Sequence, residues 1–330
     1  MSRPYDLVSL GEPLLRLTPP EGEPLRRASS LSLHVVGSQL NVAANLAGLG
    51  RKTAFLSKVP DTALGLLALD ACRGFGLDVS YITAVPGGKM GVTWVELSAA
   101  PRVPLAVFDR AGSAASTIDE SSFAWESILS QASYACTDGI FPGLSAGCAR
   151  ATEAFLTAAR ASGCVTCFDV NYRAHLWAQG EARACLRKLL PRVDILATNA
   201  DVSSSVFGFT GTEEQVMEKY AAEFGCRVVC LTRREMMGLH RGAWSSKACM
   251  DGRVSEGCRQ EFEIVDRYGT GDAWFAGFLY AWDGRDVGRA LSFGNALCAL
   301  AHTQRGDVVH VSAVEVEQVM DGRNDLRVKR

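Results

Sequence analysis

The sequence has no excess of charge of either sign. Its 330 residues include 34 lysines and arginines and 36 aspartates and glutamates, which gives a net charge of −2. We therefore expect no attraction to nucleic acid or to anionic membranes, because both need a basic surface. No apolar run is long enough to span a bilayer, and residues 1–10 lack an apolar segment behind a basic start. We expect neither a membrane anchor nor a secretory signal.

Several familiar catalytic motifs are also absent. No G-x-x-x-x-G-K-[ST] loop occurs, and no G-x-G-x-x-G follows the first predicted strand, which argues against a Walker-type nucleotide site and a nicotinamide enzyme. There is no G-x-S-x-G elbow and the chain has only five histidines, so a serine hydrolase is not indicated.

The eleven cysteines are an odd number scattered through predicted strands and helices. This favours reduced thiols in the cytoplasm over a disulfide framework. Cys164 and Cys167 are the one close pair, within a predicted strand. Residues three apart on a strand point to opposite faces, and no second pair completes a zinc set, so we expect no metal there.

Predicted strands and helices alternate from about residue 120 onward. This pattern predicts an α/β fold with a mainly parallel sheet and helices on both faces. Four further β-prone segments, at 13–18, 31–36, 91–97 and 103–108, come from two excursions of the chain. We expect them to form a small separate sheet that acts as a lid. The expected division is a core of 1–11, 38–88 and 112–330, with a lid of 12–37 and 89–111.

The stretch 266–278 contains a glycine turn followed by an apolar helix pattern, with Asp272 in the expected first turn. A helix start presents unpaired backbone N–H groups and partial positive charge, so the turn can hold a phosphate while Asp272 stands beside it as a base. The alternative is a capping aspartate after a purely structural turn.

Polar residues gather where predicted strands end. In open α/β sheets the ligand lies at that edge, so a cluster there predicts a site. Arg110 and Arg173 are the conspicuous cations, each able to bind a carboxylate or phosphate with a two-pronged contact; the alternative for each is a surface ion pair. Residues 37–41 are expected to form a turn with Asn41 at the start of a helix, either as a ligand or as a cap. The strand-end residues are Asp169, Asn171, Arg173, Asn199 and Thr232.

Two stretches resemble the signatures of the ribokinase-like (PfkB) family of carbohydrate kinases. Residues 266–278, Asp-Arg-Tyr-Gly-Thr-Gly-Asp-Ala-Trp-Phe-Ala-Gly-Phe, are similar to the family's second signature, and 37–43 to its first. The resemblance covers nearly all of the chain. Within the family it is greatest to the 2-keto-3-deoxygluconate kinases, through 11–13, 108–113, 168–177, 293–296 and 306–307.

This resemblance implies a three-layer α/β/α core with a β-sheet lid, and an enzyme that uses ATP and Mg²⁺ to phosphorylate the primary hydroxyl of a sugar acid, 2-keto-3-deoxygluconate in the first instance. It implies Asp272 as the base and Gly269, Thr270 and Gly271 as an anion hole. The residues implied to line the sugar are Gly37, Asn41, Glu12, Phe108, Arg110, Arg173 and Asp307. Those implied to face the nucleotide are Asn171, Asn199, Thr232, Arg233 and Asn295. No metal ligand is assigned, and we expect a homodimer formed through the lid.

The chain departs from the family pattern at three places. Val202 stands where a glutamate is usual, residues 233–237 replace a glycine-rich loop, and Thr93 stands where an aromatic is often found on the lid. Two alternatives therefore stay open: a kinase of fructose or another neutral sugar, with Arg110 and Arg173 structural, and a catalytically weak sugar-binding or regulatory protein.

Overall fold

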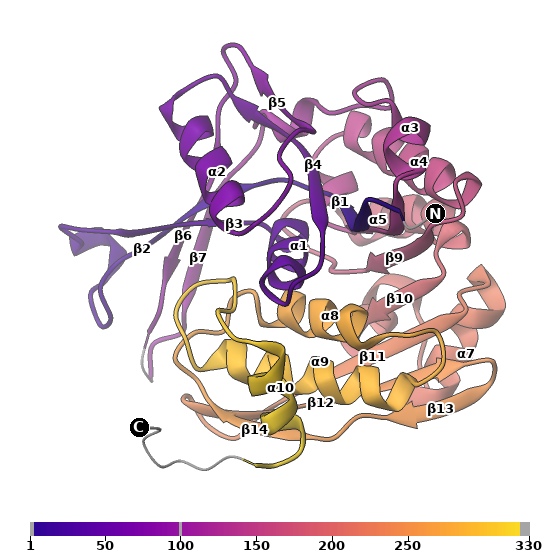
Figure 1. Cartoon of the computed structure of the whole chain (residues 1–330). Coiled ribbons are helices and arrows are strands. Elements are labelled where there is room, and N and C mark those ends of the chain that lie inside the picture. The colour runs from indigo at the N-terminus through magenta and orange to yellow at the C-terminus, as the bar shows by residue number, and fades with distance from the viewer. Residues whose placement is uncertain (1–2, 99–100, 324–330) are drawn as a thin grey trace.

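A large sheet runs through the molecule (Figure 1). The structure is a computed structural model that describes residues 3–98 and 101–323. The sheet has ten strands, with the order β13–β12–β11–β10–β9–β8–β1–β4–β5 and with β14 beside β12. Their bounds are β1 (Tyr5–Leu10), β4 (Thr53–Pro60), β5 (Ile82–Val85), β8 (Ala132–Asp138), β9 (Val165–Asp169), β10 (Ile195–Thr198), β11 (Val228–Met236), β12 (Arg241–Met250), β13 (Arg253–Glu256) and β14 (Gln260–Glu263).

The strands from β5 to β11 pair in parallel, which confirms the predicted parallel sheet. The edge beyond β11 is antiparallel and was not predicted. The pattern indicated a strand only over Val228–Thr232, yet β11 continues to Met236 and pairs with β12 along its whole length. The charged residues of 233–235 suggested a loop because side chains of this outer hairpin face solvent.

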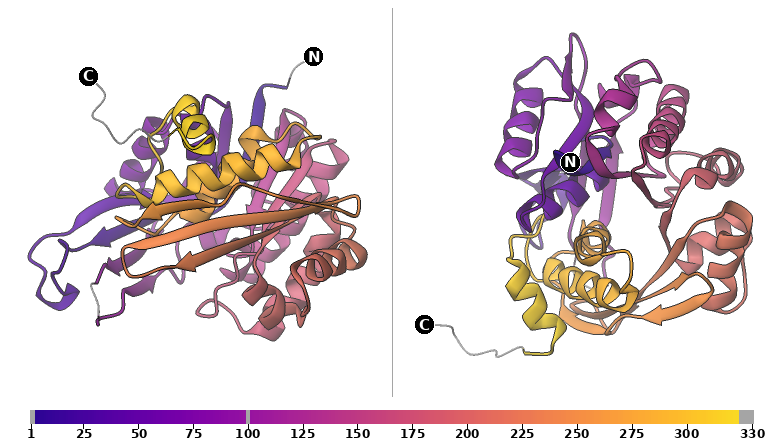
Figure 2. Two further views of the ribbon diagram at one scale, coloured as in Figure 1. Left: turned by 90° about the horizontal axis from the view of Figure 1, so that it is seen from below. Right: turned by 45° about the vertical axis from the view of Figure 1, so that its right-hand side comes forward.

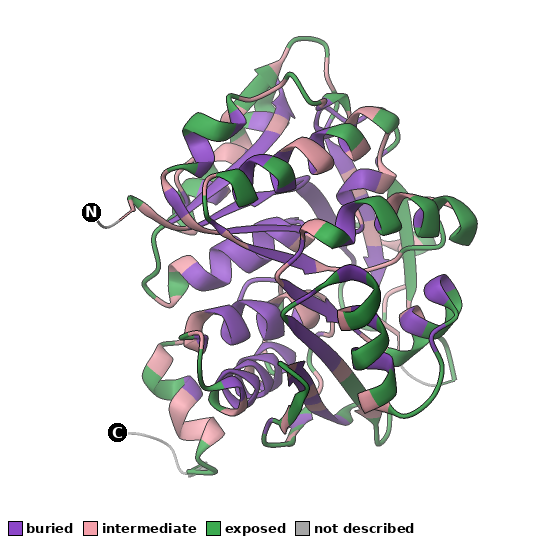
Figure 3. Cartoon of the chain, turned by 90° about the vertical axis from the view of Figure 1, so that its right-hand side faces the viewer, coloured by how far each residue is buried: buried purple, intermediate pink, exposed green. Residues whose placement is uncertain are grey.

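Helices cover both faces of the sheet (Figure 2). Two apolar clusters fill the space between sheet and helices, and neighbouring residues of β1 alternate between them: Leu7 belongs to one and Val8 to the other. Figure 3 shows buried strands beneath helices with exposed outer surfaces. One cluster includes residues of α1 (Ser38–Gly48), α2 (Ala63–Gly74), α8 (Thr270–Ala281), α9 (Val287–His302) and α10 (Ala313–Met320). The other includes residues of α3 (Trp125–Leu129), α4 (Ala146–Ala161), α5 (Gln179–Leu189) and α7 (Glu213–Phe224).

A second sheet of four strands projects from the core (Figure 1). Its order is β3–β2–β6–β7, and only the β2–β6 pair is parallel. All four strands come from the two excursions at 12–37 and 89–111, because β2 follows β1 and β6 follows β5 in the chain. Their bounds are β2 (Leu14–Thr18), β3 (Ser32–Val36), β6 (Gly91–Glu96) and β7 (Leu105–Asp109).

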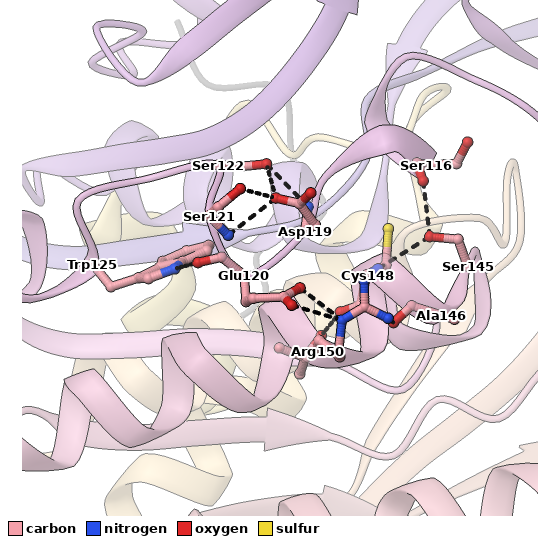
Figure 4. A network of polar contacts seen from close by, with 11 residues as sticks. Ser116, Asp119, Glu120, Ser121, Ser122, Trp125, Ser145, Ala146, Cys148 and Arg150 are labelled. Carbon is pink, nitrogen blue, oxygen red and sulfur yellow. Dashed lines mark hydrogen bonds and ion pairs between the residues drawn. The ribbon is translucent and has the colours of Figure 1, made fainter.

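The segment that returns from the small sheet is tied to the start of α4 (Figure 4). Ser145 caps this helix by accepting a hydrogen bond from the N–H of Cys148, and its hydroxyl donates to the carbonyl of Ser116. Arg150, one turn into α4, pairs with Glu120 of the same segment. These contacts attach residues 116–120 to α4.

No helix among residues 3–98 and 101–323 is long and apolar enough to cross a membrane. The same part of the chain contains no group of three His, Cys, Asp or Glu side chains that could hold a metal ion. Cys164 and Cys167 lie in different apolar clusters, on opposite faces of the sheet, as the strand pattern predicted.

Candidate active site

The turn before α8 is shaped by Asp266 and Gly269. Asp266 is buried, and its carboxylate accepts hydrogen bonds from the backbone N–H groups of the next two residues (2.7 and 3.2 Å). Gly269 has a φ of 71°, and a Cβ there would lie 2.4 Å from the carbonyl oxygen of Asp307, so only glycine fits. Helix α8 begins at Thr270, which confirms the predicted helix start and places Asp272 in its first turn.

Helix α1 supplies the two side chains that hold Asp272. The amide of Asn41 donates to one carboxylate oxygen (2.7 Å), and the hydroxyl of Ser38 donates to the other (2.9 Å). Asn171 in turn donates to the Ser38 hydroxyl (3.0 Å), so the segment after β9 joins the same network. Ser38 was missed from the sequence, since nothing near it indicated a partner 234 residues away.

The predicted turn over residues 37–41 is wrong, because α1 begins at Ser38. Gly37 lies against the segment that follows β1: a Cβ on Gly37 would stand 2.2 Å from the carbonyl oxygen of Glu12. Helix α1 starts at the next residue. Asn41 is therefore inside the first turn and is not the cap residue. Its side-chain oxygen accepts from the N–H of Gly37 (3.3 Å), which leaves its amide free to reach Asp272.

Burial and hydrogen bonding have opposite effects on the pKa of Asp272. Burial raises its pKa to about 7, with smaller upward effects of Asp307 and Asp138, while the hydrogen bonds from Asn41 and Ser38 lower it. A carboxyl group with such a pKa changes its protonation state close to neutral pH, which suits a residue that must accept a proton. The geometry thus favours the functional interpretation of Asp272 over a cap.

Two further carboxyl groups stand at neighbouring strand ends. Asp138 ends β8, is almost fully buried, and accepts from the N–H groups of the two residues that begin the next turn, Ile140 and Phe141 (3.0 Å each). Asp169 ends β9, and burial together with Asp272 and Asp138 raises its pKa to about 8. Sequence reasoning overlooked Asp138, although its position directly after a predicted strand was the available signal.

A first cavity lies between the small sheet and the core and has a volume of about 140 Å³. Its lining comes from strands β2, β6 and β7, from the start of α1 and from the turn before α8. All seven residues expected to line the sugar are found around it: Gly37, Asn41, Glu12, Phe108, Arg110, Arg173 and Asp307.

The buried arginines of this cavity are paired with carboxylates. Arg110 donates to Glu12 through Nε (2.8 Å) and Nη2, and burial raises the pKa of Glu12 against the effect of Arg110. Arg16 of β2 bridges Asp266 and Asp307, and its guanidinium lies 4.6 Å from the centre of the Tyr268 ring. Arg16 is only 2% exposed. The strand pattern gave no sign of this burial, because its partners lie 250 and 291 residues away.

The small sheet touches the core across the cavity through Phe108. Its ring stacks on His175, with centroids 4.5 Å apart and planes at 14°. Burial, with Arg110 and Arg173, lowers the pKa of His175. His175 was not among the predicted site residues.

Two polar side chains of the first cavity have no hydrogen-bond partner among residues 3–98 and 101–323. Both polar atoms of the Gln39 amide and the hydroxyl of Thr93 are buried without a hydrogen bond. Buried polar groups are nearly always paired, so such groups lining a cavity mark positions where a ligand hydroxyl or water belongs. Thr93 is the position where the family often has an aromatic residue.

A second cavity, of about 720 Å³, opens on the other side of Asp272. It follows the ends of β9, β10 and β11 and the start of α8. Four of the residues expected to face the nucleotide line it: Asn171, Asn199, Thr232 and Arg233. Arg173, Tyr268, Gly269 and Asp272 line both cavities.

Asn295 does not line either cavity, and the expectation that it faces the nucleotide is wrong. It is fully buried within α9, where its side-chain oxygen accepts from Ser246 and Trp274 and its amide donates to the carbonyl of Cys258. The amide is satisfied by these core contacts. Asn199 remains at the cavity but also caps a short helix by accepting from the N–H of Val202 (2.9 Å).

Comparison with known proteins agrees with this geometry. Residues 5–312 match the family model described as pfkB family carbohydrate kinase. The chain is 34% identical to the 2-dehydro-3-deoxygalactonokinase of Haloferax volcanii over 318 residues, which is 96% of this chain and 97% of that protein. It is 31% identical to the 2-dehydro-3-deoxygluconokinase of Thermoproteus tenax, over 91% of this chain and 89% of that one.

The fold has a close counterpart among solved structures. The crystal structure of 2-dehydro-3-deoxygluconokinase from Thermotoga maritima superposes with a TM-score of 0.92 and 31% sequence identity, covering 98% of this chain and all of that one. This match includes both sheets, so the mainly parallel core and the smaller sheet occur in it together.

Proposed function

The chain belongs to the pfkB family of carbohydrate kinases, and on that premise we propose that it transfers the γ-phosphoryl group of ATP to the primary hydroxyl of a 2-keto-3-deoxy sugar acid, with 2-keto-3-deoxygluconate as the first candidate. The proposal rests on the position and the pKa of Asp272. This residue stands where the two cavities meet, with a pKa near 7 and beside a helix start. There it can take the proton of a hydroxyl while the backbone N–H groups of 269–271 bind the moving phosphoryl group.

The carboxylate of the substrate is assigned to Arg173. Its exposed side chain lines the first cavity and has no ion pair among the described residues, whereas Glu12 already takes two N–H groups of Arg110. Gln39 and Thr93 are assigned to substrate hydroxyls, because their buried polar atoms need partners. The named relatives act on sugar acids that differ at C4, so both epimers are candidates.

The second cavity suits Mg²⁺ bound together with ATP. The raised pKa of Asp169 reflects repulsion from Asp272 and Asp138 in addition to burial, and a cation would relieve it. Since the described residues offer no group of three ligands, the ion would be held mainly by phosphate oxygens and water, with Asp169 nearby. When bound, it neutralises charge on the phosphate chain.

A substrate panel tests the proposal. Turnover of ATP is measured with both C4 epimers of the 2-keto-3-deoxy sugar acid, with fructose, and with the sugar acid's neutral reduced counterpart. We expect kcat/KM for the better sugar acid to exceed that for fructose by at least about a hundredfold, because a site built to bind a polar substrate group discriminates strongly against a substrate that lacks it. Preference for fructose would assign Arg173 a structural role, and binding of sugar without any turnover would favour a regulatory protein.

We also propose that the small sheet is a lid and that two copies pair through it in the cytoplasm. Leu33 of β3 and Leu105 and Val107 of β7 are each more than 40% exposed, and all eleven cysteines are free, which suits a reducing compartment. Light scattering of the purified protein should give the mass of a dimer, and a monomer at working concentration would reject the pairing.

A further inference from the structure

Arg234 lies on the outer hairpin, yet its guanidinium reaches the turn beside Asp272. It pairs in register with Trp244 on β12, and its guanidinium lies 5.2 Å from the centre of that indole ring. Nη2 donates to the hydroxyl of Thr270, the first residue of α8, at 2.9 Å. The indole face and the hydroxyl together aim this charge at the start of the helix.

The charge of Arg234 is not compensated by any carboxylate in residues 3–98 and 101–323. The neighbouring Arg233 and Arg259 of the same sheet edge both pair with Glu235. Arg234 is open to the water of the second cavity, but enough protein surrounds it that desolvation, together with Arg267 and Arg173, lowers its pKa.

Arg173 and Arg267 line the same cavity and likewise form no ion pair within the described residues. Asp169 and Asp272 line the same cavity, but neither is within ion-pair distance of these three guanidinium groups. The mutual repulsion of the three groups would be relieved by an anion bound among them. The cavity volume of about 720 Å³ is sufficient for a nucleotide with its phosphate chain. The cluster thus points to a polyanion, with Arg234 nearest to the start of α8.

We propose that Arg234 is a catalytic residue that binds the phosphoryl group during its transfer. The inference rests on the proposed kinase reaction and deepens it. In that reaction the bond between the γ-phosphorus and the bridging β-oxygen breaks, a bond from the γ-phosphorus to the sugar oxygen forms, and the hydroxyl proton passes to Asp272. Arg234 donates hydrogen bonds to the equatorial oxygens, where charge is spread in the transition state.

The chain departs here from the usual family pattern, which has a glycine-rich loop over 233–237. Glycine-rich turns can bind anions through backbone N–H groups. Here the strand β11 continues through this region, so its backbone is engaged with β12 up to Met236. Arg234 therefore offers side-chain donors beside the start of α8 in a region where the backbone is paired with β12.

The test compares Arg234→Ala and Arg234→Lys with Arg259→Ala as the matched control. Arg259 lies at the same sheet edge, is exposed and paired, and lines neither cavity. We expect Arg234→Ala to lower kcat by about a hundredfold to a thousandfold, the range for one electrostatic donor, with partial recovery in Arg234→Lys. Added guanidinium ion should restore part of the lost rate, and Arg259→Ala should stay within about twofold of the parent enzyme.

Calorimetric titration with ATP and with AMP separates this role from a structural one. Loss of a phosphate contact should weaken ATP binding by about tenfold and leave AMP binding unchanged. A kcat within threefold of the parent enzyme, or equal losses for ATP and AMP, would overturn the proposal. If no sugar acid is turned over by the parent enzyme, the kinase proposal fails, but the ATP and AMP titrations still decide whether Arg234 binds the phosphate chain.

Discussion

The arginines around the candidate site differ in whether a carboxylate compensates their charge. Arg16 and Arg110 line only the first cavity, the proposed sugar-side cavity; they are 2% and 8% exposed, and both are paired. Arg173, at the boundary of both cavities, and Arg234, in the second or proposed nucleotide-side cavity, are exposed and have no ion pair within the described residues. A buried charge without a partner is very costly, whereas an exposed one is hydrated until a ligand arrives.

This difference indicates how each half of the site is prepared. In the smaller cavity the charges of Arg16 and Arg110 are compensated by carboxylates of the protein itself. In the larger cavity Arg173 and Arg234 have no such partner within the described residues, which suits the proposed binding of a phosphate chain. Arg173 lines both cavities, so a single unpaired guanidinium can serve the sugar-acid carboxylate at the boundary.

The largest expected effect on activity is that of replacing Asp272, which lies where the two cavities meet. Replacing Asp272 by Asn keeps the hydrogen-bonding shape but removes the base, and we expect kcat to fall by about a hundredfold to ten-thousandfold. Steady-state turnover measures the loss, and titration with ATP and sugar acid checks that both cavities still bind. A variant that retains a tenth of the activity would remove Asp272 from the mechanism.

The paired and unpaired arginines should differ most clearly in stability. Arg16→Met leaves Asp266 and Asp307 buried without their cation and should cost about 3–5 kcal/mol in the free energy of unfolding. Arg173→Met should change it by no more than about 0.5 kcal/mol, since the side chain is exposed and unpaired. Urea unfolding compares the two variants, and equal losses would invalidate the distinction between paired and unpaired arginines.

A substitution of Gln39 tests whether the first cavity binds the hydroxyl groups of the sugar substrate. Gln39→Met preserves volume but removes both unpartnered polar atoms, and we expect kcat/KM for the sugar acid to fall by roughly tenfold to a hundredfold. The KM for ATP should not change, because Gln39 does not line the second cavity. An unchanged kcat/KM for both C4 epimers would show that water satisfies the amide.

The pH profile reports on Asp272 directly. Because its pKa is raised to about 7, the carboxyl group is protonated below that pH and cannot act as a base. We expect kcat/KM to fall about tenfold per pH unit below pH 7. The free energy of unfolding should change in the opposite direction. The folded state holds a proton on Asp272 more tightly than the unfolded state does, so the stabilisation by this group that is present at pH 4 is lost as the pH rises through 7. A flat activity profile from pH 5 to 8 would contradict the assignment.

The smallest expected effect is that of salt. Raising KCl from 50 to 300 mM should increase the KM for ATP by about threefold, since screening weakens exposed charges most. The KM for a sugar acid should rise less, because it depends on one exposed arginine. If both constants respond equally, the charges of the two cavities are equally accessible.

Much of the site could be predicted from the sequence where a single local segment defines it. The glycine turn and Asp272 lie within thirteen residues, and helix α8 begins where the pattern indicated. The strand-end residues Asp169 and Asn171 were predictable too, because the carboxyl ends of parallel strands meet at one edge. The alternating pattern likewise predicted the large sheet up to β11.

Only the tertiary structure showed which charges are paired. Nothing in 14–18 indicates that Arg16 is buried, because its partners Asp266 and Asp307 follow some 250 or more residues later. Asn295 was misassigned for the same reason: its amide is satisfied by Ser246 and Trp274, which the helix alone does not reveal.

By itself the sequence determined the fold class, the helix that begins at the glycine turn, and the identity of the acid in its first turn. These depend on backbone preferences and apolar periodicity, which are local. The tertiary structure decided that Ser38 and Asn41 hold Asp272, that Arg16 and Arg110 are paired with carboxylates, and that Arg234 reaches Thr270 without an ion pair among the described residues. Charge compensation depends on distances across the chain, and those exist only once the two sheets have packed together.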